Sequence, residues 1–354
     1  MSPLTRRVFL SGSAAATCAA VAGAAEPVAR PKIKIGQIGV GHAHASKLAV
    51  FRRSHDFEVV GVVEEDAQLR DWAASQPAFR DLPWLTRRQL LDVPGLQLVL
   101  VETHVRDLLD AAEAAVEAGK HVHLDKPAGE SLPQYRRILQ SAASQKLLVQ
   151  MGYMYRYNPG VVLLRQALQA GWLGEVFEVT AVMSKVVAPA DRRKLAEYPG
   201  GIMFELGCHV IDLVIGVLGK PDRVTAFPRR VSPADDKLVD NMLAVLEYPR
   251  ATATVRSSAV EVDGFSRRHL TVCGTQGAFH IQPLDNPVVR ATFAAPHGDY
   301  RAGYQDIALP KYERYIADAA DIAAVIRGEK PADFSYQHDL AVQEALVRAS
   351  GLTG

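Results

Sequence analysis

Two segments of this chain hold side chains that could move a proton. Lys126 follows a short strand-like run, and a lysine ammonium can donate a hydrogen bond to an alcohol or alkoxide oxygen. Glu205 and His209 are four residues apart, so on a helix they share a stripe with Asp212. A histidine oriented by a carboxylate one turn away can act as a general base near neutral pH. These residues predict proton transfer at a hydroxyl group.

Both observations also have simpler explanations. A lysine that follows a strand can be an ordinary surface residue, and Lys126 taken alone fits that explanation equally well. The segment around Glu205 and His209 is apolar almost all round the expected helix, and ionisable groups in such surroundings need partners or a chemical role. A buried polar cluster that joins two domains is therefore the alternative to a general base.

A pair of glycines near the start of the chain predicts a dinucleotide-binding loop. Gly39 permits a tight turn after a strand, and Gly41 lets backbone amides approach a pyrophosphate at a helix N-terminus. The next strand ends at Glu64, in the interval expected for an acid that binds ribose hydroxyls and repels a 2′-phosphate, so we expect NAD rather than NADP. A turn beside a solvated acidic run is the alternative. We expect further cofactor contacts from the rest of the loop, Val40, His42, Ala43 and His44, the last standing where a small residue is usual.

The elements that must position these residues fall into two groups, which predict an α/β fold. Residues 31–150 alternate β-rich runs with helical stretches, as in a doubly wound parallel Rossmann sheet. The expected strands are 33–38, 57–63, 96–101, 121–124 and 147–150, and the clearest helix is 106–118.

Residues 151–354 predict a C-terminal α/β domain for substrate binding and oligomerisation, because their strands are grouped in what reads as an open, mainly antiparallel sheet. Residues 285–310 read as an irregular polar excursion. The expected strands are 175–185, 223–227, 242–248, 252–259, 269–272 and 278–281, and the expected helices are 159–170, 201–217, 312–327 and 336–349.

The first 25 residues resemble an export signal rather than part of the fold. Arg6 and Arg7 precede a short alanine-rich stretch and a small-residue cleavage site near Ala24 or Ala25, the pattern of a twin-arginine signal peptide. An uncleaved membrane anchor is the alternative. We expect a periplasmic or other extracytoplasmic location. Because this route carries folded proteins into a compartment poor in free NAD, we also expect the cofactor to be tightly bound.

Composition narrows the range of partners. The formal net charge of +1 over 354 residues indicates neither nucleic acid nor a membrane surface as a partner. After removal of the signal only Cys208 and Cys273 remain, which predicts no disulfide framework.

Several ordered motifs together resemble the Gfo/Idh/MocA oxidoreductases, the family of glucose-fructose oxidoreductase and inositol dehydrogenase. The resemblance covers essentially all of the chain after the signal. It rests on the glycine loop, residues 118–122 leading to Asp125-Lys126-Pro127, Arg156-Tyr157-Asn158-Pro159, residues 205–212, Gly274-Thr275-Gln276-Gly277 and residues 326–331.

The resemblance implies roles for individual residues. Lys126 matches the catalytic lysine of the family's Glu-Lys-Pro motif, with Asp125 in place of the glutamate. Glu205 and His209 match its acid-x-x-x-His pair, with glutamate in place of aspartate. Where the family tends to have Thr-Pro-Asn near the nicotinamide ribose, this chain has Glu102, Thr103 and His104, which we expect, with Asp125, to contact the cofactor. Arg156, Lys185 and Asp212 are expected to contact the substrate, although Lys185 could equally cap an exposed strand.

Hydride transfer from a carbohydrate hydroxyl to NAD is the function these residues predict. His209 would accept the hydroxyl proton, Glu205 would orient His209, and Lys126 would polarise the substrate oxygen. Two alternatives remain: a glycosidase that oxidises C3 transiently and eliminates the leaving group, and a non-catalytic sugar-sensing protein. Loop histidines near Glu102 could in principle ligate a metal, but no tight ligand spacing supports one, so no metal is expected. A homo-oligomer formed through the C-terminal sheet is expected.

Overall fold

The computed structural model describes residues 30–352. The expected signal peptide, residues 1–25, lies outside the described residues. Residues 32–354 form one unit. Within the described chain, no helix has the length and apolar character needed to span a membrane.

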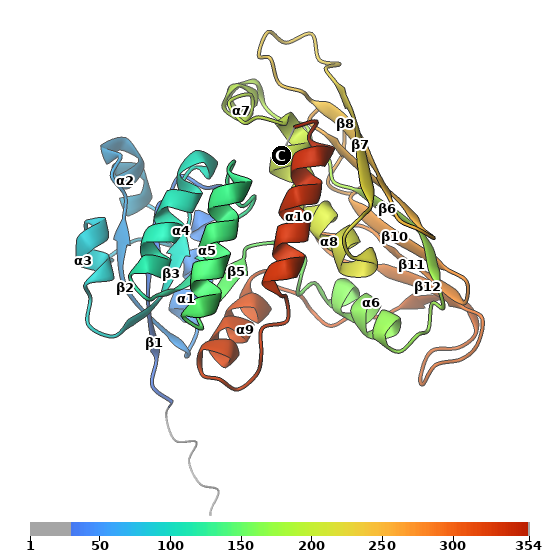
Figure 1. The fold of residues 1–354 in the computed structure, drawn as a ribbon, viewed down its shortest axis with the longest axis horizontal. Helices are drawn as coiled ribbons and strands as arrows, with labels where there is room; N and C mark the ends of the chain where they lie inside the picture. The colour runs from blue at the N-terminus through green and yellow to red at the C-terminus, as the bar shows by residue number, and fades with distance from the viewer. Residues whose placement is uncertain (1–29, 353–354) are drawn as a thin grey trace, which may run out of the picture. The chain divides into compact units, whose positions relative to one another are not determined.

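The first sheet has five parallel strands in the order β2-β1-β3-β4-β5, which confirms the expected Rossmann topology (Figure 1). All carboxyl ends therefore meet at one edge, where open α/β sheets bind ligands. The strands are β1 (Ile33–Ile38), β2 (Phe57–Val63), β3 (Leu96–Val101), β4 (His121–Leu124) and β5 (Val149–Met151).

Local signals explain where the helices of this domain begin and end. The side chain of Ser131 caps α5 (Leu132–Ser144) at Gln134, and Thr86 forms a capping box with Gln89. Gly119, at φ +72°, follows the C-cap residue of α4. The remaining bounds are α1 (Leu48–Arg53), preceded by the 3₁₀ turn Ala45–Lys47, α2 (Ala67–Ala74), α3 (Arg87–Leu91) and α4 (Leu108–Glu117), which follows the 3₁₀ turn Val105–Asp107.

The second sheet has eight strands in the order β13-β12-β11-β10-β6-β9-β8-β7. All neighbours are antiparallel except β6 and β9, so the expected mainly antiparallel sheet is confirmed. Its strands are β6 (Val176–Val182), β7 (Arg223–Arg229), β8 (Asn241–Glu247), β9 (Thr252–Ser258), β10 (His269–Gly274), β11 (Gly277–Ile281), β12 (Val289–Phe293) and β13 (Gly303–Ile307).

The expected irregular excursion over residues 285–310 is wrong, because it contains β12 and β13. In β12, Val289, Ala291 and Phe293 are buried while Arg290 and Thr292 are exposed. This is the alternation of a half-buried strand.

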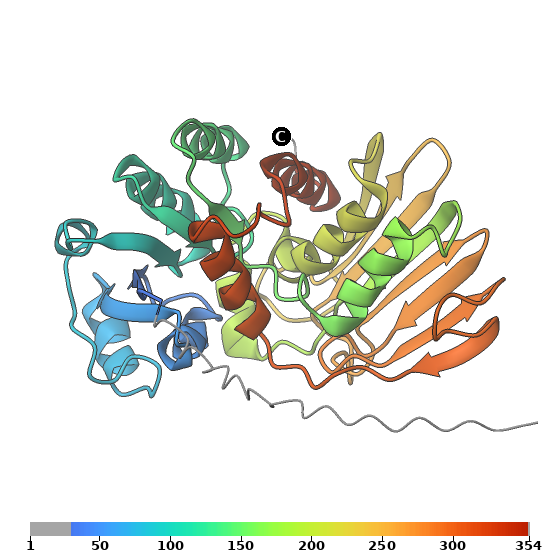
Figure 2. The same cartoon turned by 90° about the horizontal axis from the view of Figure 1, so that it is seen from below.

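Helices lie on one face of the second sheet, and none covers the other face in the described chain (Figure 2). The covering helices come from the whole length of the second half of the chain. They are α6 (Pro159–Gln169), α8 (Cys208–Leu218), which follows a π-helical turn at Met203–Gly207, and α10 (Tyr336–Ala349). A shorter helix, α7 (Pro189–Leu195), lies where a loop was expected.

Helix α9 (Ile316–Ile326) returns to the first domain. Ala319, Ile322 and Ala323 are buried in the same apolar cluster as Leu48 and Phe51 of α1. Residues 151–354 are therefore not a self-contained second domain, because α9 completes the Rossmann core. The helix expected over 312–327 begins only at Ile316.

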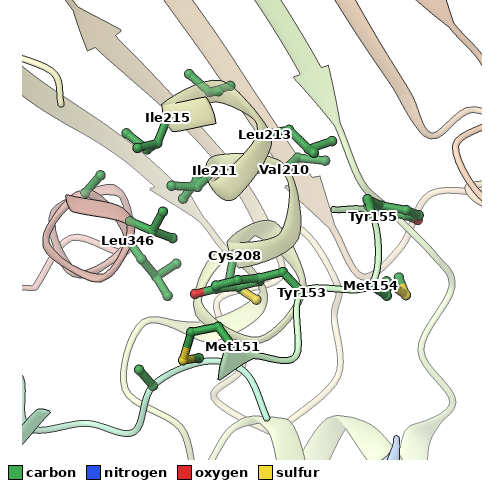
Figure 3. Packing of buried hydrophobic residues seen from close by; sticks show 14 of the residues in the cluster. Met151, Tyr153, Met154, Tyr155, Cys208, Val210, Ile211, Leu213, Ile215 and Leu346 are labelled. Carbon is green, nitrogen blue, oxygen red and sulfur yellow. The ribbon is translucent and has the colours of Figure 1, made fainter. Parts of the chain in front are cut away.

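The connection between the domains packs directly on α8. Figure 3 shows Met151 and Tyr153 beside Cys208, and Val210, Ile211 and Leu213 further along the helix. All of these side chains belong to one buried cluster that extends from the Rossmann helices to the second sheet. The Rossmann domain and the helices on the second sheet consequently share one apolar core. This shared core fixes α8 near the carboxyl edge of the first sheet.

Candidate functional site

The glycine loop has no room for larger residues. Gly39 has φ +89°, and a Cβ there would lie 2.5 Å from the backbone nitrogen of Thr103. A Cβ at Gly41 would lie 2.9 Å from Nε2 of His104. The amide of Val40 donates a hydrogen bond to Oε2 of Glu64 at 2.9 Å, which joins the loop to the end of β2. A pyrophosphate-binding turn requires this close packing, and it requires a residue that can adopt a positive φ without strain, as Gly39 does.

Two hollows lie along the carboxyl edge of the first sheet. The smaller, of about 360 Å³, is lined by Gly39, Glu64, Thr103 and His104 among others. The larger, of about 840 Å³, has Gly41, His42 and Ala43 on one side and Lys185, Tyr198 and Glu205 on the other. Both are lined by Asp66, Leu69, His104 and Arg106, so they join into one groove between the domains.

Lys126 and Glu205 meet at this groove although they come from different domains. The Lys126 ammonium donates to the Glu205 backbone oxygen at 2.9 Å and lies 3.5 Å from Oε1. Burial would lower the pKa of Lys126, but the facing Glu205 carboxylate raises it above its ordinary value. Burial would raise the pKa of Glu205, but Lys126 and then Lys185 lower it to about 2. The pair is therefore charged at neutral pH.

His209 lies behind this pair and is 1% exposed. Its ring centroid is 5.7 Å from that of His44 and about 6 Å from those of Tyr153 and Tyr155. Burial, with Lys126 nearby, lowers the pKa of His209 well below its ordinary value, so the imidazole is neutral. Its Nδ1 has no hydrogen-bond partner among the described residues.

The expected single stripe of Glu205, His209 and Asp212 does not exist. Glu205 belongs to the π-helical turn, whereas His209 and Asp212 belong to α8. The wider turn changes the direction of the side chains, so the three residues have different surroundings. Of the three, Glu205 lines the larger hollow.

Arg156 and Asp212 lie away from the groove, in a buried ion-pair cluster. Arg156 donates from Nη2 to Asp212 at 2.7 Å and to Asp339 of α10 at 2.5 Å. His338 contributes a further contact to Asp212, at 2.9 Å. The expected substrate contacts of Arg156 and Asp212 are not supported by this placement. We assign to this pair a structural role, because it connects the interdomain segment to α8 and α10.

Three expected cofactor contacts also lie behind the loop. Glu102 and Asp125 are 0% exposed, and neither they nor His44 lines either hollow. Asp125 accepts from His44 Nδ1 at 3.2 Å and from the Lys126 backbone nitrogen at 2.6 Å. Asp125 and Glu102 therefore support the loop and the lysine rather than touch a ligand in the groove.

Most of the other expected residues line the groove, whereas Val40, Lys126 and His209 are buried behind its wall. His42, Ala43, Lys185, Thr103 and His104 each border one hollow or both. The Nε2–H of His42 also donates to the carbonyl oxygen of Lys126 at 3.0 Å, which joins the glycine loop to the Asp125-Lys126-Pro127 segment.

Sequence reasoning missed Lys47 and Tyr315. The Lys47 side chain is fully buried beside Asp125, and the Tyr315 ring centroid lies 5.1 Å from its ammonium. The position of Lys47, eight residues after Gly39 on the face of the turn that packs against the sheet, was the available signal. No comparable signal marks Tyr315, which reaches the site from the far end of the chain.

Together these features fit a dinucleotide. A glycine cradle that a Cβ would fill, an acid at the end of β2 and a groove along the carboxyl edge suit its pyrophosphate and ribose groups. The unpartnered Oε2 of Glu205, with Lys126 behind it, leaves polar groups available for a second molecule.

Comparisons with known proteins agree with this geometry. Residues 33–153 match the family description "Oxidoreductase family, NAD-binding Rossmann fold", and residues 161–280 match "GFO/IDH/MocA C-terminal domain". The inositol 2-dehydrogenase of Paracoccus denitrificans is 31% identical over 314 residues, which cover 82% of this chain and 86% of that protein. The uncharacterized oxidoreductase YhhX of Escherichia coli is 30% identical over 197 residues, 56% of each chain, so this chain matches little more than half of that relative's length.

Solved structures show the same fold. The aldose-aldose oxidoreductase from Caulobacter crescentus superimposes with a TM-score of 0.75 at 18% identity, covering 91% of this chain and 98% of the other. The UDP-N-acetylglucosamine 3-dehydrogenase from Acidithiobacillus ferrooxidans gives 0.74 at 20% identity, with coverage of 91% and 98%. By its sequence match, its two domains and its nucleotide loop, the chain belongs to the GFO/IDH/MocA family of oxidoreductases with an NAD-binding Rossmann fold.

Proposed function

We propose that this protein oxidises a secondary alcohol of a sugar or polyol, with NAD held in the groove. The observation that carries the proposal is the meeting of Lys126 and Glu205, 3.5 Å apart, beside the hollow that the glycine loop lines. A buried lysine facing a carboxylate from another domain is costly to maintain without a role. The position of this pair beside the hollow favours a catalytic role over a pair that only joins the two domains.

The residues divide the work as follows. The Lys126 ammonium, kept charged by Glu205, hydrogen-bonds the reacting oxygen and stabilises its developing negative charge. The neutral His209 has an unpartnered Nδ1 that can accept the hydroxyl proton. Because His209 lines neither hollow, the reacting hydroxyl has to reach past the Lys126–Glu205 contact to meet it. Glu205 orients the substrate by accepting a hydrogen bond at Oε2. When the substrate binds, its reacting oxygen replaces Oε1 of Glu205 as a partner of the Lys126 ammonium. NAD supplies the hydride acceptor when bound.

The substrate class rests on relatives and on the groove. Two relatives are inositol dehydrogenases, from Paracoccus denitrificans and Thermotoga maritima, and the latter is 23% identical over 85% of this chain. The groove presents Lys185, His104 and Glu205, polar groups suited to several hydroxyls. We extend the proposal to NAD rather than NADP, because Glu64 borders the ribose end of the groove.

Export and tight retention of the cofactor belong to the same proposal. They rest on Arg6 and Arg7 and the small residues near Ala24. Because a retained cofactor is not exchanged, the NADH must be reoxidised in place by a second substrate, a carbonyl compound. Denaturing the purified protein is expected to release NAD(H), and a preparation that is active only with added NAD would contradict retention.

The decisive experiment compares Lys126→Ala with Lys194→Ala, a lysine at the rim of the same hollow. Reduction of the bound NAD forms NADH, which has its own absorbance band. Sugars, polyols and glycosides can therefore be screened by the increase in NADH absorbance. Lys126→Ala is expected to keep NAD and lose its reduction, because the reacting oxygen loses its charged partner. Lys194→Ala is expected to behave as wild type.

Product analysis separates the remaining alternatives. A keto-sugar is expected to accumulate. Release of a free reducing sugar from a glycoside would favour the glycosidase instead, and normal turnover by Lys126→Ala would contradict the assigned role of the lysine.

A further inference from the structure

Behind the glycine loop lies an ammonium surrounded by acceptors from separate strands. Lys47 ends the 3₁₀ turn Ala45–Lys47, and its side chain is fully buried. Nζ lies 2.7 Å from Oδ2 of Asp125, 2.9 Å from Oε1 of Glu102 and 3.0 Å from Nε2 of His123. The contacts with Asp125 and His123 are hydrogen bonds, and the contact with Glu102 is an ion pair. Gly152 packs against the same ammonium, since a Cβ at this position would lie only 3.0 Å from Nζ. The space around the ammonium is therefore tightly filled on the side of Gly152 as well.

The two carboxylates that pair with this ammonium also lie beside two histidines, and these are side chains of the types that bind divalent metals. His42 Nδ1, His44 Nδ1 and an Asp125 oxygen all lie within 4.8 Å of one another. Oε2 of Glu102 is 3.7 Å from His42 Nδ1 and has no hydrogen-bond partner among the described residues. His42 gives its other ring N–H to the carbonyl oxygen of Lys126, as metal-bound histidines commonly do. Two imidazoles and two carboxylates form a common donor set for Zn²⁺ or Mn²⁺.

Electrostatics explain why a cation is needed at this place. Burial would raise the pKa of Asp125, but His42 and Lys47 lower it well below its ordinary value. Burial and the neighbouring Asp125 raise the pKa of Glu102. Burial would lower the pKa of Lys47, but the two carboxylates raise it. Without the ammonium, the two buried carboxylates would face each other uncompensated.

Asp125 in turn helps to position the groups proposed to act on the substrate. Its Oδ1 accepts from the backbone nitrogen of Lys126 at 2.6 Å and from His44 Nδ1 at 3.2 Å. The His44 ring in turn lies 5.7 Å from that of His209. The backbone nitrogen of His42 donates to the carbonyl oxygen of Glu102 at 3.0 Å. One buried charge thus holds both the nucleotide loop and the start of the Lys126-Pro127 segment.

We propose that Lys47 is a positioning residue that acts as a tethered cation. Its ammonium pairs with Glu102 and Asp125, the two carboxylates that would ligate a divalent metal beside His42 and His44, and so fixes the glycine loop and Lys126. Removing the ammonium without filling its space should therefore convert the cluster into a metal site.

The test uses two substitutions at Lys47 and Co²⁺ as the probe. Lys47→Ala opens the space and is expected to bind one Co²⁺ with the visible absorption of an imidazole and carboxylate site. Lys47→Leu fills the space and is expected to bind none. Wild type and Lys34→Ala, a lysine at the opposite end of the first sheet, are also expected to bind none.

Turnover provides the second readout, which rests on the proposed function. Lys47→Ala is expected to lose about 10- to 100-fold in kcat, as supporting residues around charged sites do, and to recover part of it with Co²⁺ or Mn²⁺. Lys47→Leu should lose turnover without recovery. A merely structural lysine would give no metal-dependent recovery.

Clear outcomes would overturn the proposal. Stoichiometric Co²⁺ binding by wild type at the loop histidines would show that Lys47 does not keep the two carboxylates from a metal. Failure of folded Lys47→Ala to bind Co²⁺ would do the same. If Lys47→Ala folds only when Co²⁺ is present during refolding, the cation requirement is supported directly. The binding results stand even if no alcohol is oxidised, so failure of the proposed function would be distinguishable.

Discussion

At the scale of single residues, the nucleotide loop depends on space as much as on backbone freedom. Gly39 has a positive φ and also lies against the backbone of Thr103. Gly119 has a positive φ of 72° too, but a Cβ there would meet nothing within 4 Å. The two positions therefore separate backbone strain from steric exclusion.

Replacing Gly39 by alanine is expected to displace the loop from the end of β3 and weaken NAD binding by more than about tenfold, or about 1.4 kcal/mol. Gly119→Ala is the matched control. It should cost about 1–2 kcal/mol of stability from the left-handed backbone alone and leave NAD binding unchanged. Calorimetric titration with NAD after removal of bound cofactor, together with urea unfolding, measures both. Equal NAD affinity in the two variants would contradict the steric argument.

The residues of the site were predictable to different degrees. Glycine spacing and the position of Lys126 after a strand are local patterns; the structure places Gly39 and Gly41 in the lining of the groove and Lys126 behind it, in contact with Glu205. Lys47 was missed because a lysine is usually exposed: its spacing from Gly39 was a weak signal, and only the three-dimensional arrangement shows two carboxylates converging on it. Arg156 and Asp212 carry the residue types of a substrate site, but they pair with each other and with Asp339 in a buried cluster away from the groove.

At the scale of elements, α9 brings a carboxyl group into the Rossmann core. Asp318 is 3% exposed, and its Oδ2 has no hydrogen-bond partner among the described residues. Burial raises the pKa of Asp318 to about 7, although Lys47 and Arg156 oppose the rise and Asp321 adds to it. The folded state therefore holds this proton more tightly than the unfolded chain does.

A pH dependence of stability follows from that difference. Between about pH 4 and pH 7 the folded protein binds more protons than the unfolded chain, so Asp318 makes the free energy of unfolding fall as pH rises. The slope from one such group is at most about 1.4 kcal/mol per pH unit. In Asp318→Asn this contribution is absent. Urea unfolding of both proteins across this range measures the difference, and parallel curves would exclude the raised pKa.

Elements were predictable where their patterns are local. The five parallel strands and the helices α6 and α10 follow hydrophobic periodicity and capping residues, and the structure has them close to the expected bounds. Strands β12 and β13 were missed because polar residues and turns around them obscure a short alternation. The π-helical turn was missed because its wider hydrogen bonding has no sequence signature, and with it the expected stripe failed.

At the scale of the whole molecule, the second sheet has a face that no described helix covers (Figure 2). Phe227 and Leu243 are cross-strand partners on this face, 42% and 37% exposed, and Tyr304 is 60% exposed on the far strand. Threonines and His280 lie between them; Thr271 and His280 are hydrogen-bonded at 2.8 Å. Charged residues such as Arg256, opposite Leu243, and Arg290, opposite His280, lie on the same face. A broad face that mixes exposed apolar and charged side chains suits a second copy of the chain.

We expect a homo-oligomer in which this face is buried. Leu243→Arg should reduce the mass measured by light scattering to that of a monomer, because it replaces an exposed apolar side chain of this face by a second positive charge beside Arg256. Val262→Arg is the control, since Val262 is 81% exposed but lies outside the sheet. A monomeric wild type, or an oligomer that tolerates Leu243→Arg, would contradict this expectation.

The return of α9 has a consequence for the order in which the protein can mature on the ribosome. The first 151 residues contain all five strands of the nucleotide domain, yet its core lacks Ala319, Ile322 and Ala323 until more than 320 residues have been made. The Tyr315 ring that covers Lys47 arrives just as late. The cofactor pocket therefore cannot be finished while the chain is still being extended, and NAD is captured only by a nearly complete polypeptide.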